Sequence, residues 1–115
     1  MKKLGKKEHT HRGFEVVRFK DFNQQECSIQ QSSICLEDCN NAVGGSALWI
    51  GVDDAKPMIL AKHATKLGLE TSQQNGWIDY PIPDDVSLHT RIHVNREQVA
   101  GLIERLTKWL KTSKL

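Results

Sequence analysis

Four stretches of this chain are rich in β-branched, aromatic and other apolar residues or alternate between apolar and polar residues, and these patterns are typical of β-strands. The predicted strands span residues 14–19, 27–34, 47–52 and 87–94. Residues 47–52 form the most apolar of the four, and the small residues Ala47 and Gly51 flank Trp49 on one face. This pattern leaves two interpretations open: a hollow over the sheet at Trp49, or close packing by a helix.

A helical period replaces the strand period after Asn95. Apolar residues then recur every three or four positions as far as Leu110, which predicts a helix over residues 96–111. Asn95 is a favourable N-cap, and Gln98 stands three residues later, as in a capping box. The apolar stripe of this helix requires a sheet to pack on, and the apolar strand faces supply one.

Turn-forming residues are frequent between the third and fourth predicted strands, from residue 53 to residue 86. Within this segment, residues 58–60 predict a short strand and residues 61–67 a short helix that ends at Gly68. The loop that follows carries Trp77 and Tyr80, and long loops with large aromatic residues pack on their domain or cover a binding site. The predicted fold class is α+β: a four-stranded, mostly antiparallel sheet packed on one C-terminal helix, with a loop and short-helix insertion between strands 3 and 4.

Charge is distributed unevenly along the 115 residues. The first 12 residues carry a net charge of about +4, so we expect a disordered basic tail there and a single domain over residues 13–115. The rest of the chain has a net charge of about −2, which argues against a domain that coats nucleic acid. The sequence has neither a membrane-spanning apolar run nor the apolar core of a secretory signal, so a cytosolic protein without a membrane partner is expected.

The signature motifs of P-loop nucleotidases, dinucleotide-binding enzymes, zinc proteases and serine hydrolases are absent, which favours a binding protein without a cofactor over an enzyme. The three cysteines, Cys27, Cys35 and Cys39, are expected as reduced thiols. A zinc site that combines the last two cysteines with His89 and His93 is disfavoured, because two histidines four residues apart on one strand stand roughly 13 Å apart. A small enzyme that uses Cys27 together with a histidine remains as a third hypothesis.

Basic side chains gather on one face of the predicted strand 87–94, where Arg91 lies between two histidines. The helix begins directly after this strand, and backbone N–H groups at a helix N-terminus favour negative charge. Aromatic side chains of the preceding loop are suited to stack on a base, and serine and glutamine on strand 27–34 add hydrogen-bonding groups. This combination predicts a site for an anionic, nucleotide-like ligand. The predicted binding residues are Arg91, His93, Asn95, Arg96, His89, Trp77, Tyr80, Ser28 and Gln30.

Several segments of the chain resemble a family of small proteins encoded by bacteriophages and prophages, for which no activity is established. They are Cys27–Ser33, Trp49–Asp54, Gly76–Trp77 with Tyr80–Asp84, and Thr90–Val99. The resemblance implies a phage accessory protein in the cytosol of the bacterial host, which counters immunity by occupancy rather than turnover. One partner that fits is an anionic nucleotide-like signal, which the protein sequesters. The alternative is a host defence protein such as a nuclease, inhibited because the acidic pairs 53–54 and 84–85 mimic nucleic-acid phosphate. Whether the protein forms a homo-oligomer is left open.

Overall fold

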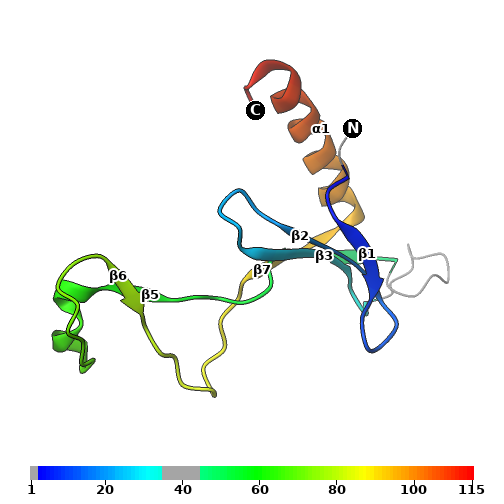
Figure 1. Cartoon of the computed structure of the whole chain (residues 1–115). Helices are drawn as coiled ribbons and strands as arrows, with labels where there is room; N and C mark the ends of the chain where they lie inside the picture. The colour runs from blue at the N-terminus through cyan, green and yellow to red at the C-terminus, as the bar shows by residue number, and fades with distance from the viewer. Residues whose placement is uncertain (1–2, 35–44) are drawn as a thin grey trace. The chain divides into compact units, whose positions relative to one another are not determined.

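The computed structural model describes residues 3–34 and 45–115, and it shows an α+β protein (Figure 1). The chain divides into two compact units. One unit comprises the chain up to Asp53 together with everything from Thr90 onward, and the other runs from Asp54 to His89. The second unit therefore corresponds closely to the insertion predicted over residues 53–86.

A five-stranded antiparallel sheet forms the first unit, in the order β1-β2-β3-β4-β7. Its strands are β1 (Lys6–His9), β2 (Glu15–Lys20), β3 (Glu26–Gln31), β4 (Ala47–Val52) and β7 (Arg91–Asn95). The prediction of four strands was one too few, because residues 6–9, expected in the disordered tail, form β1. Two ion pairs join β1 to β2: Lys7 Nζ lies 3.0 Å from Glu15 Oε1, and Arg18 Nε lies 2.9 Å from Glu8 Oε2.

The strand register gives the sheet two different faces. Alternation along each strand puts residues that pair directly across the sheet on the same face. We call one face the polar face; its members include Val16, Arg18, Ser28, Gln30, Trp49, Gly51, Arg91 and His93. The other is the apolar face; its members include Val17, Phe19, Cys27, Ile29, Gln31, Leu48, Ile50, Val52, Ile92 and Val94. The predicted faces of strands 27–34 and 47–52 are confirmed by this register.

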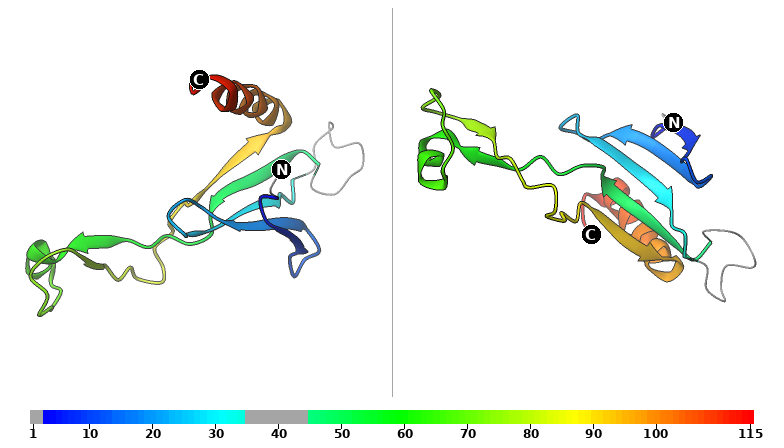
Figure 2. Two further views of the ribbon diagram at one scale, coloured as in Figure 1. Left: turned by 45° about the horizontal axis from the view of Figure 1, so that its top comes forward. Right: turned by 90° about the horizontal axis from the view of Figure 1, so that it is seen from below.

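The C-terminal helix α1 spans Arg96–Thr112, one residue longer than predicted. The capping box is confirmed: Asn95 Oδ1 accepts from the Gln98 backbone N–H at 2.8 Å, and Gln98 Oε1 accepts from the Asn95 N–H at 3.0 Å. Of the helix residues, all of which lie in the described part of the chain, Val99 and Leu102 are half-buried and the rest are exposed. The helix thus leaves the sheet after its first two turns and its far end projects from the strands (Figure 2). No helix in residues 3–34 or 45–115 is long and apolar enough to cross a membrane.

The second unit, described by itself, is built on a short antiparallel strand pair, β5 (Met58–Leu60) and β6 (Trp77–Asp79). Two 3₁₀ turns, η2 (Ala61–His63) and η3 (Thr65–Leu67), follow β5, and Gly68 ends the second with a φ of 81°. The short strand and the short helical segment that ends at Gly68 are therefore confirmed. The expected loop over residues 70–86 is interrupted by β6, which begins at Trp77.

Candidate functional site

A cluster of four side chains occupies the polar face where β3, β4 and β7 lie side by side. The rings of Trp49 and His93 stack with centroids 3.8 Å apart and an interplanar angle of 6°. Arg91 Cζ lies 5.6 Å from the centroid of the Trp49 ring, within the range of a cation–π contact. Arg91 Nη1 also donates a hydrogen bond of 3.0 Å to Gln30 Oε1. These contacts hold a guanidinium, two stacked rings and an amide together on one surface.

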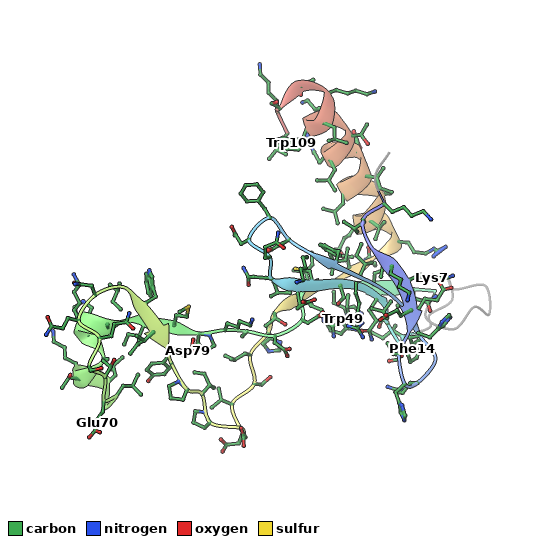
Figure 3. The ribbon with its side chains drawn as sticks, viewed as in Figure 1. Lys7, Phe14, Trp49, Glu70, Asp79 and Trp109 are labelled. Atoms are coloured by element: carbon green, nitrogen blue, oxygen red, sulfur yellow. The ribbon has the colours of Figure 1, made fainter. Side chains whose placement is uncertain are left out.

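A hollow of about 270 Å³ opens beside this cluster, and we call it the Trp49 hollow. Strands β3 and β4 contribute Gln30 and Trp49 to it, and the turn between β1 and β2 contributes the opposite rim. Figure 3 shows Phe14 near that turn and Trp49 on the sheet. The full lining consists of Thr10, His11, Arg12, Phe14, Gln30, Gln31, Ser33 and Trp49.

The β1–β2 turn is fixed by hydrogen bonds at its base. Thr10 and Phe14 pair twice, because the Thr10 N–H donates to the Phe14 carbonyl at 2.8 Å and Thr10 Oγ1 accepts from the Phe14 N–H at 3.1 Å. Gly13 supplies the left-handed conformation that closes the turn, with a φ of 89°. Arg12, at the tip, has its guanidinium carbon 5.3 Å from the centroid of the Phe14 ring. The turn therefore holds a second guanidinium against a second aromatic ring at the hollow.

The acidic groups of the polar face are already engaged with other partners. Asp53 Oδ1 accepts a 2.5 Å hydrogen bond from the buried Ser28 hydroxyl, and Asp53 Oδ2 lies 3.5 Å from Arg18 Nη1. Glu8 also pairs with Arg18. Arg12 and Arg91 have no ion-pair partner within residues 3–34 and 45–115. Arg12 lines the hollow, so its charge is available to an anion there. Arg91 lies beside the hollow, against the lining residues Gln30 and Trp49.

His93 carries a buried polar atom that lacks a hydrogen bond. Its Nε2 has no hydrogen-bond partner among the residues that the structure describes. Buried polar groups in proteins are almost always hydrogen-bonded, and the exceptions concentrate at strained or functional positions. The stack on Trp49 holds this ring in place, so the cluster keeps one unused hydrogen-bonding position.

The structure brings together Arg91, His93 and Gln30, three of the nine predicted binding residues. His89 does not join them: the predicted strand 87–94 was too long, β7 begins at Arg91, and His89 belongs to the second unit. Trp77 and Tyr80 belong to that unit as well.

The remaining three predicted residues have structural partners. The Asn95 side chain caps α1, and Arg96 Nη1 donates to the Gly45 carbonyl at 2.7 Å. Ser28 is buried against Asp53. Each of the three therefore has a partner in the local fold, and none of them lines the Trp49 hollow.

The β1–β2 turn was not predicted, because residues 1–12 were expected to form a tail. Arg12 and Phe14 thus appear at the site without having been predicted there. One signal was available: Ala47 and Gly51 on either side of Trp49 left open a hollow over the sheet, and the Trp49 ring does line one.

The described part of the chain offers little support for metal or thiol chemistry. Within residues 3–34 and 45–115, no group of three or more His, Cys, Asp or Glu side chains is placed to hold a metal ion. Cys35 and Cys39 lie outside the described residues. Cys27 is a free thiol that is 4% exposed. Burial raises the pKa of the Cys27 thiol above its ordinary value of 9.0, and the charges of Asp21 and Asp53 act in the same direction.

We expect Cys27 in the folded protein to react at least about tenfold more slowly with iodoacetamide than the same residue in urea, because it stays a buried thiol. The measurement uses mass spectrometry at pH 8 on a Cys35→Ser/Cys39→Ser variant. Above a pH of about 9 the unfolded chain releases the thiol proton while the folded chain retains it, so the free energy of unfolding should fall as the pH rises further. If folded Cys27 were alkylated as fast as in the unfolded chain, the result would support the hypothesis of an enzyme that uses Cys27.

No family model, no curated protein and no solved structure matches this chain. A functional assignment therefore depends on the geometry of the site.

Proposed function

We propose that this protein is a non-enzymatic binding protein for a small anionic ligand with a planar ring, such as a nucleotide, held in the Trp49 hollow. The observation that carries the proposal is the Arg91 guanidinium, which lies over the Trp49 ring and is oriented by Gln30. An arginine provides five N–H donors in a fork that matches phosphate, and Gln30 uses one of them. The Phe14 ring, which also lines the hollow, adds an aromatic contact for a base.

The volume of the hollow limits the size of the ligand that it can hold. Pockets for small molecules usually measure about 300–1,000 Å³, so a hollow of about 270 Å³ suits one ring with one phosphate group. A mononucleotide, or one half of a dinucleotide or ADP-ribose-like signal, fits this description. Following the resemblance to phage proteins, the proposed role is sequestration of such a signal in the bacterial cytosol, which would blunt a defence response.

Inhibition of a host nuclease through acidic loops has weaker support. The proposed mimicry needs exposed carboxylates, but Asp53 is already bound to Ser28 and Arg18. Asp84 and Asp85 are exposed, so one of the two acidic pairs remains available. Loss of a co-purifying host protein on charge reversal at these two residues would favour this alternative.

Calorimetric titration of the wild-type protein with nucleoside monophosphates, dinucleotides, ADP-ribose and inorganic phosphate tests the proposal. We expect at least one of the nucleotides to bind about tenfold or more tightly than inorganic phosphate, because the ring adds stacking to the anion contact. Arg12→Gln should weaken that binding by about five- to tenfold, since it removes a charged donor from the rim. Arg12 is exposed at a turn tip, so the substitution leaves the sheet intact.

The matched control is Arg105→Gln, the same chemical change on α1. It should leave the affinity unchanged. Equal losses in the two variants would point to nonspecific charge attraction, and the absence of binding by every nucleotide tested would reject the proposal.

A further inference from the structure

Helix α1 and the sheet leave matching apolar surfaces open on the side away from the Trp49 hollow. Past its first two turns, the helix exposes an apolar stripe. The exposed fractions are 60% for Ile103, 55% for Leu106, 50% for Trp109 and 77% for Leu110. Figure 3 shows Trp109 on this projecting end. A stripe of this kind is normally buried against a sheet or another helix.

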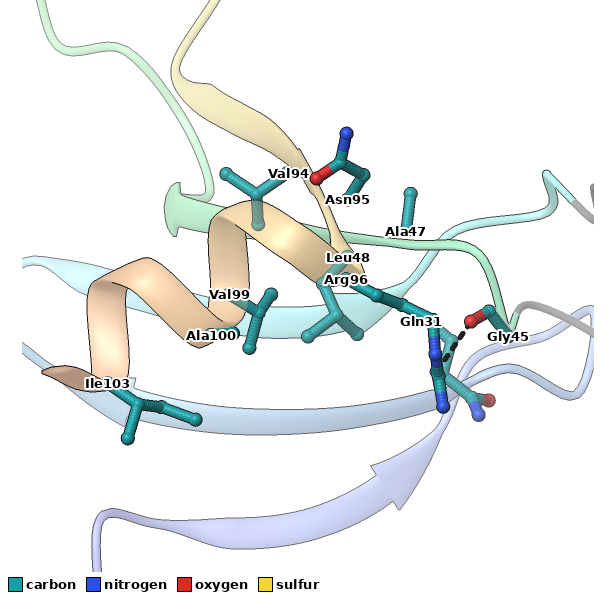
Figure 4. Close-up of a pocket in the computed structure, with 10 residues that line it drawn as sticks. All are labelled: Gln31, Gly45, Ala47, Leu48, Val94, Asn95, Arg96, Val99, Ala100 and Ile103. Atoms are coloured by element: carbon teal, nitrogen blue, oxygen red, sulfur yellow. Dashed lines mark hydrogen bonds between the residues drawn. The ribbon is translucent and has the colours of Figure 1, made fainter. Parts of the chain in front are cut away.

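The apolar face of the sheet is wider than the one helix that it carries. Five strands at about 4.8 Å spacing span roughly 24 Å, whereas a helix covers about 10 Å. Helix α1 lies beside β4 and β7, where Leu48 and Val94 meet Val99 in an open groove of about 440 Å³ (Figure 4). On the β2 and β3 side, Val17, Phe19 and Ile29 are half-buried, and within the first unit no helix covers them.

We propose that a second copy of this chain covers both surfaces, with the projecting end of each α1 packed on the β2–β3 half of the partner's apolar face. Each copy exposes one apolar helix stripe and leaves one half of a sheet face uncovered. A symmetric dimer in which each helix packs on the partner's sheet therefore buries both surfaces. A lipid surface would cover the stripe but leave the sheet open. The projecting end, roughly ten residues or about 15 Å long and about 10 Å wide, covers roughly 150 Å² and receives as much in return. The resulting footprint of roughly 300 Å² per partner is that of a weak, concentration-dependent dimer.

The charged and exposed residues at the hairpin between β2 and β3 support a second copy of the chain as the partner. Arg105 flanks the stripe, and it makes no ion pair with the residues that the structure describes. Asp21, at the hairpin, also lacks a basic partner among them, and its Oδ1 accepts two backbone N–H groups. Beside it Phe22 is 99% exposed, in reach of a helix laid over β2 and β3. In the proposed dimer, Arg105 of one copy therefore lies near Asp21 and Phe22 of the other.

Sedimentation velocity of the full chain tests the proposal, and we expect a dimer. The double substitution Leu106→Gln/Leu110→Gln should weaken dimerisation at least about tenfold, because it places polar groups in the buried stripe. Both residues are exposed in the single chain, so helix content by circular dichroism should stay unchanged. The matched control, Glu104→Gln/Lys108→Gln, introduces the same residues at the same spacing on the opposite helix face and should leave the dimer intact.

The variant Phe22→Ser tests the sheet side and should also weaken the dimer. A wild-type protein that is monomeric at every concentration would overturn the proposal, and so would monomers that sediment with anionic vesicles, since the occupant would then be lipid. A dimer that tolerates the leucine substitutions or Phe22→Ser would exclude this interface. The nucleotide titration is independent of these outcomes, because the hollow lies on the other face of the sheet.

Discussion

Replacing Arg91 by alanine is expected to weaken nucleotide binding by roughly tenfold to a hundredfold, the loss of a charge-assisted hydrogen bond in a partly desolvated position. Arg91 is half-buried, oriented by Gln30 and packed over Trp49. Because its guanidinium is already ordered in the free protein, ligand binding costs it little further conformational entropy. Arg12, exposed at the turn tip, lacks this preorganisation, which is why a smaller effect is expected there. The measurement is a calorimetric titration with the tightest-binding nucleotide.

Arg91→Lys separates charge from geometry. Lysine keeps the positive charge but lacks the planar fork, so it should recover only part of the affinity. The Trp49 ring gives a second readout: in a Trp77→Phe/Trp109→Phe background, nucleotide should quench Trp49 fluorescence in the Arg91 protein and much less in Arg91→Ala. An alanine variant that keeps full affinity and full quenching would move the ligand elsewhere.

Substituting Gly51 by alanine is expected to destabilise the protein by about 2–4 kcal/mol. Gly51 has a φ of 147°, which L-residues rarely adopt. A Cβ at this position would lie 2.7 Å from the Thr90 carbonyl oxygen and 2.9 Å from Arg91 Cα, both backbone atoms of the neighbouring strand segment. Because these atoms cannot move independently, β4 and β7 would have to separate, and Arg91 would shift relative to Trp49. Urea unfolding measures the loss, and nucleotide affinity should fall with it.

The control for this experiment is Gly101→Ala. Gly101 lies inside α1, and a Cβ there meets nothing within 4 Å, so alanine should stabilise the protein by about 0.5–1 kcal/mol through helix propensity. Both proteins are compared at one concentration, because dimerisation would couple stability to concentration. A Gly51→Ala protein as stable as the wild type would mean that β4 and β7 do not approach as closely as described.

The sequence determined the elements whose signals are local. The apolar run of residues 47–52 located β4 to the residue, and the period of two assigned the faces of β3 and β4 correctly, since alternation depends on nothing outside the strand. The capping box at Asn95 likewise fixed the start of α1, because the reciprocal hydrogen bonds join residues three apart. Gly68 ended the 3₁₀ segment for the same kind of reason.

Tertiary structure alone decided where these elements meet. Residues 6–9 carry no strand pattern of their own, and they become β1 because β2 offers a pairing edge and two ion-pair partners. That pairing creates the turn at Thr10–Phe14 and sets it beside Gln30 and Trp49, far along the chain, to form the hollow. Conversely, His89 looked like a neighbour of Arg91 by alternation, but the strand begins only where β4 supplies hydrogen bonds. Pairing partners distant in sequence leave no periodic signal, so local patterns could identify the strands but not the site between them.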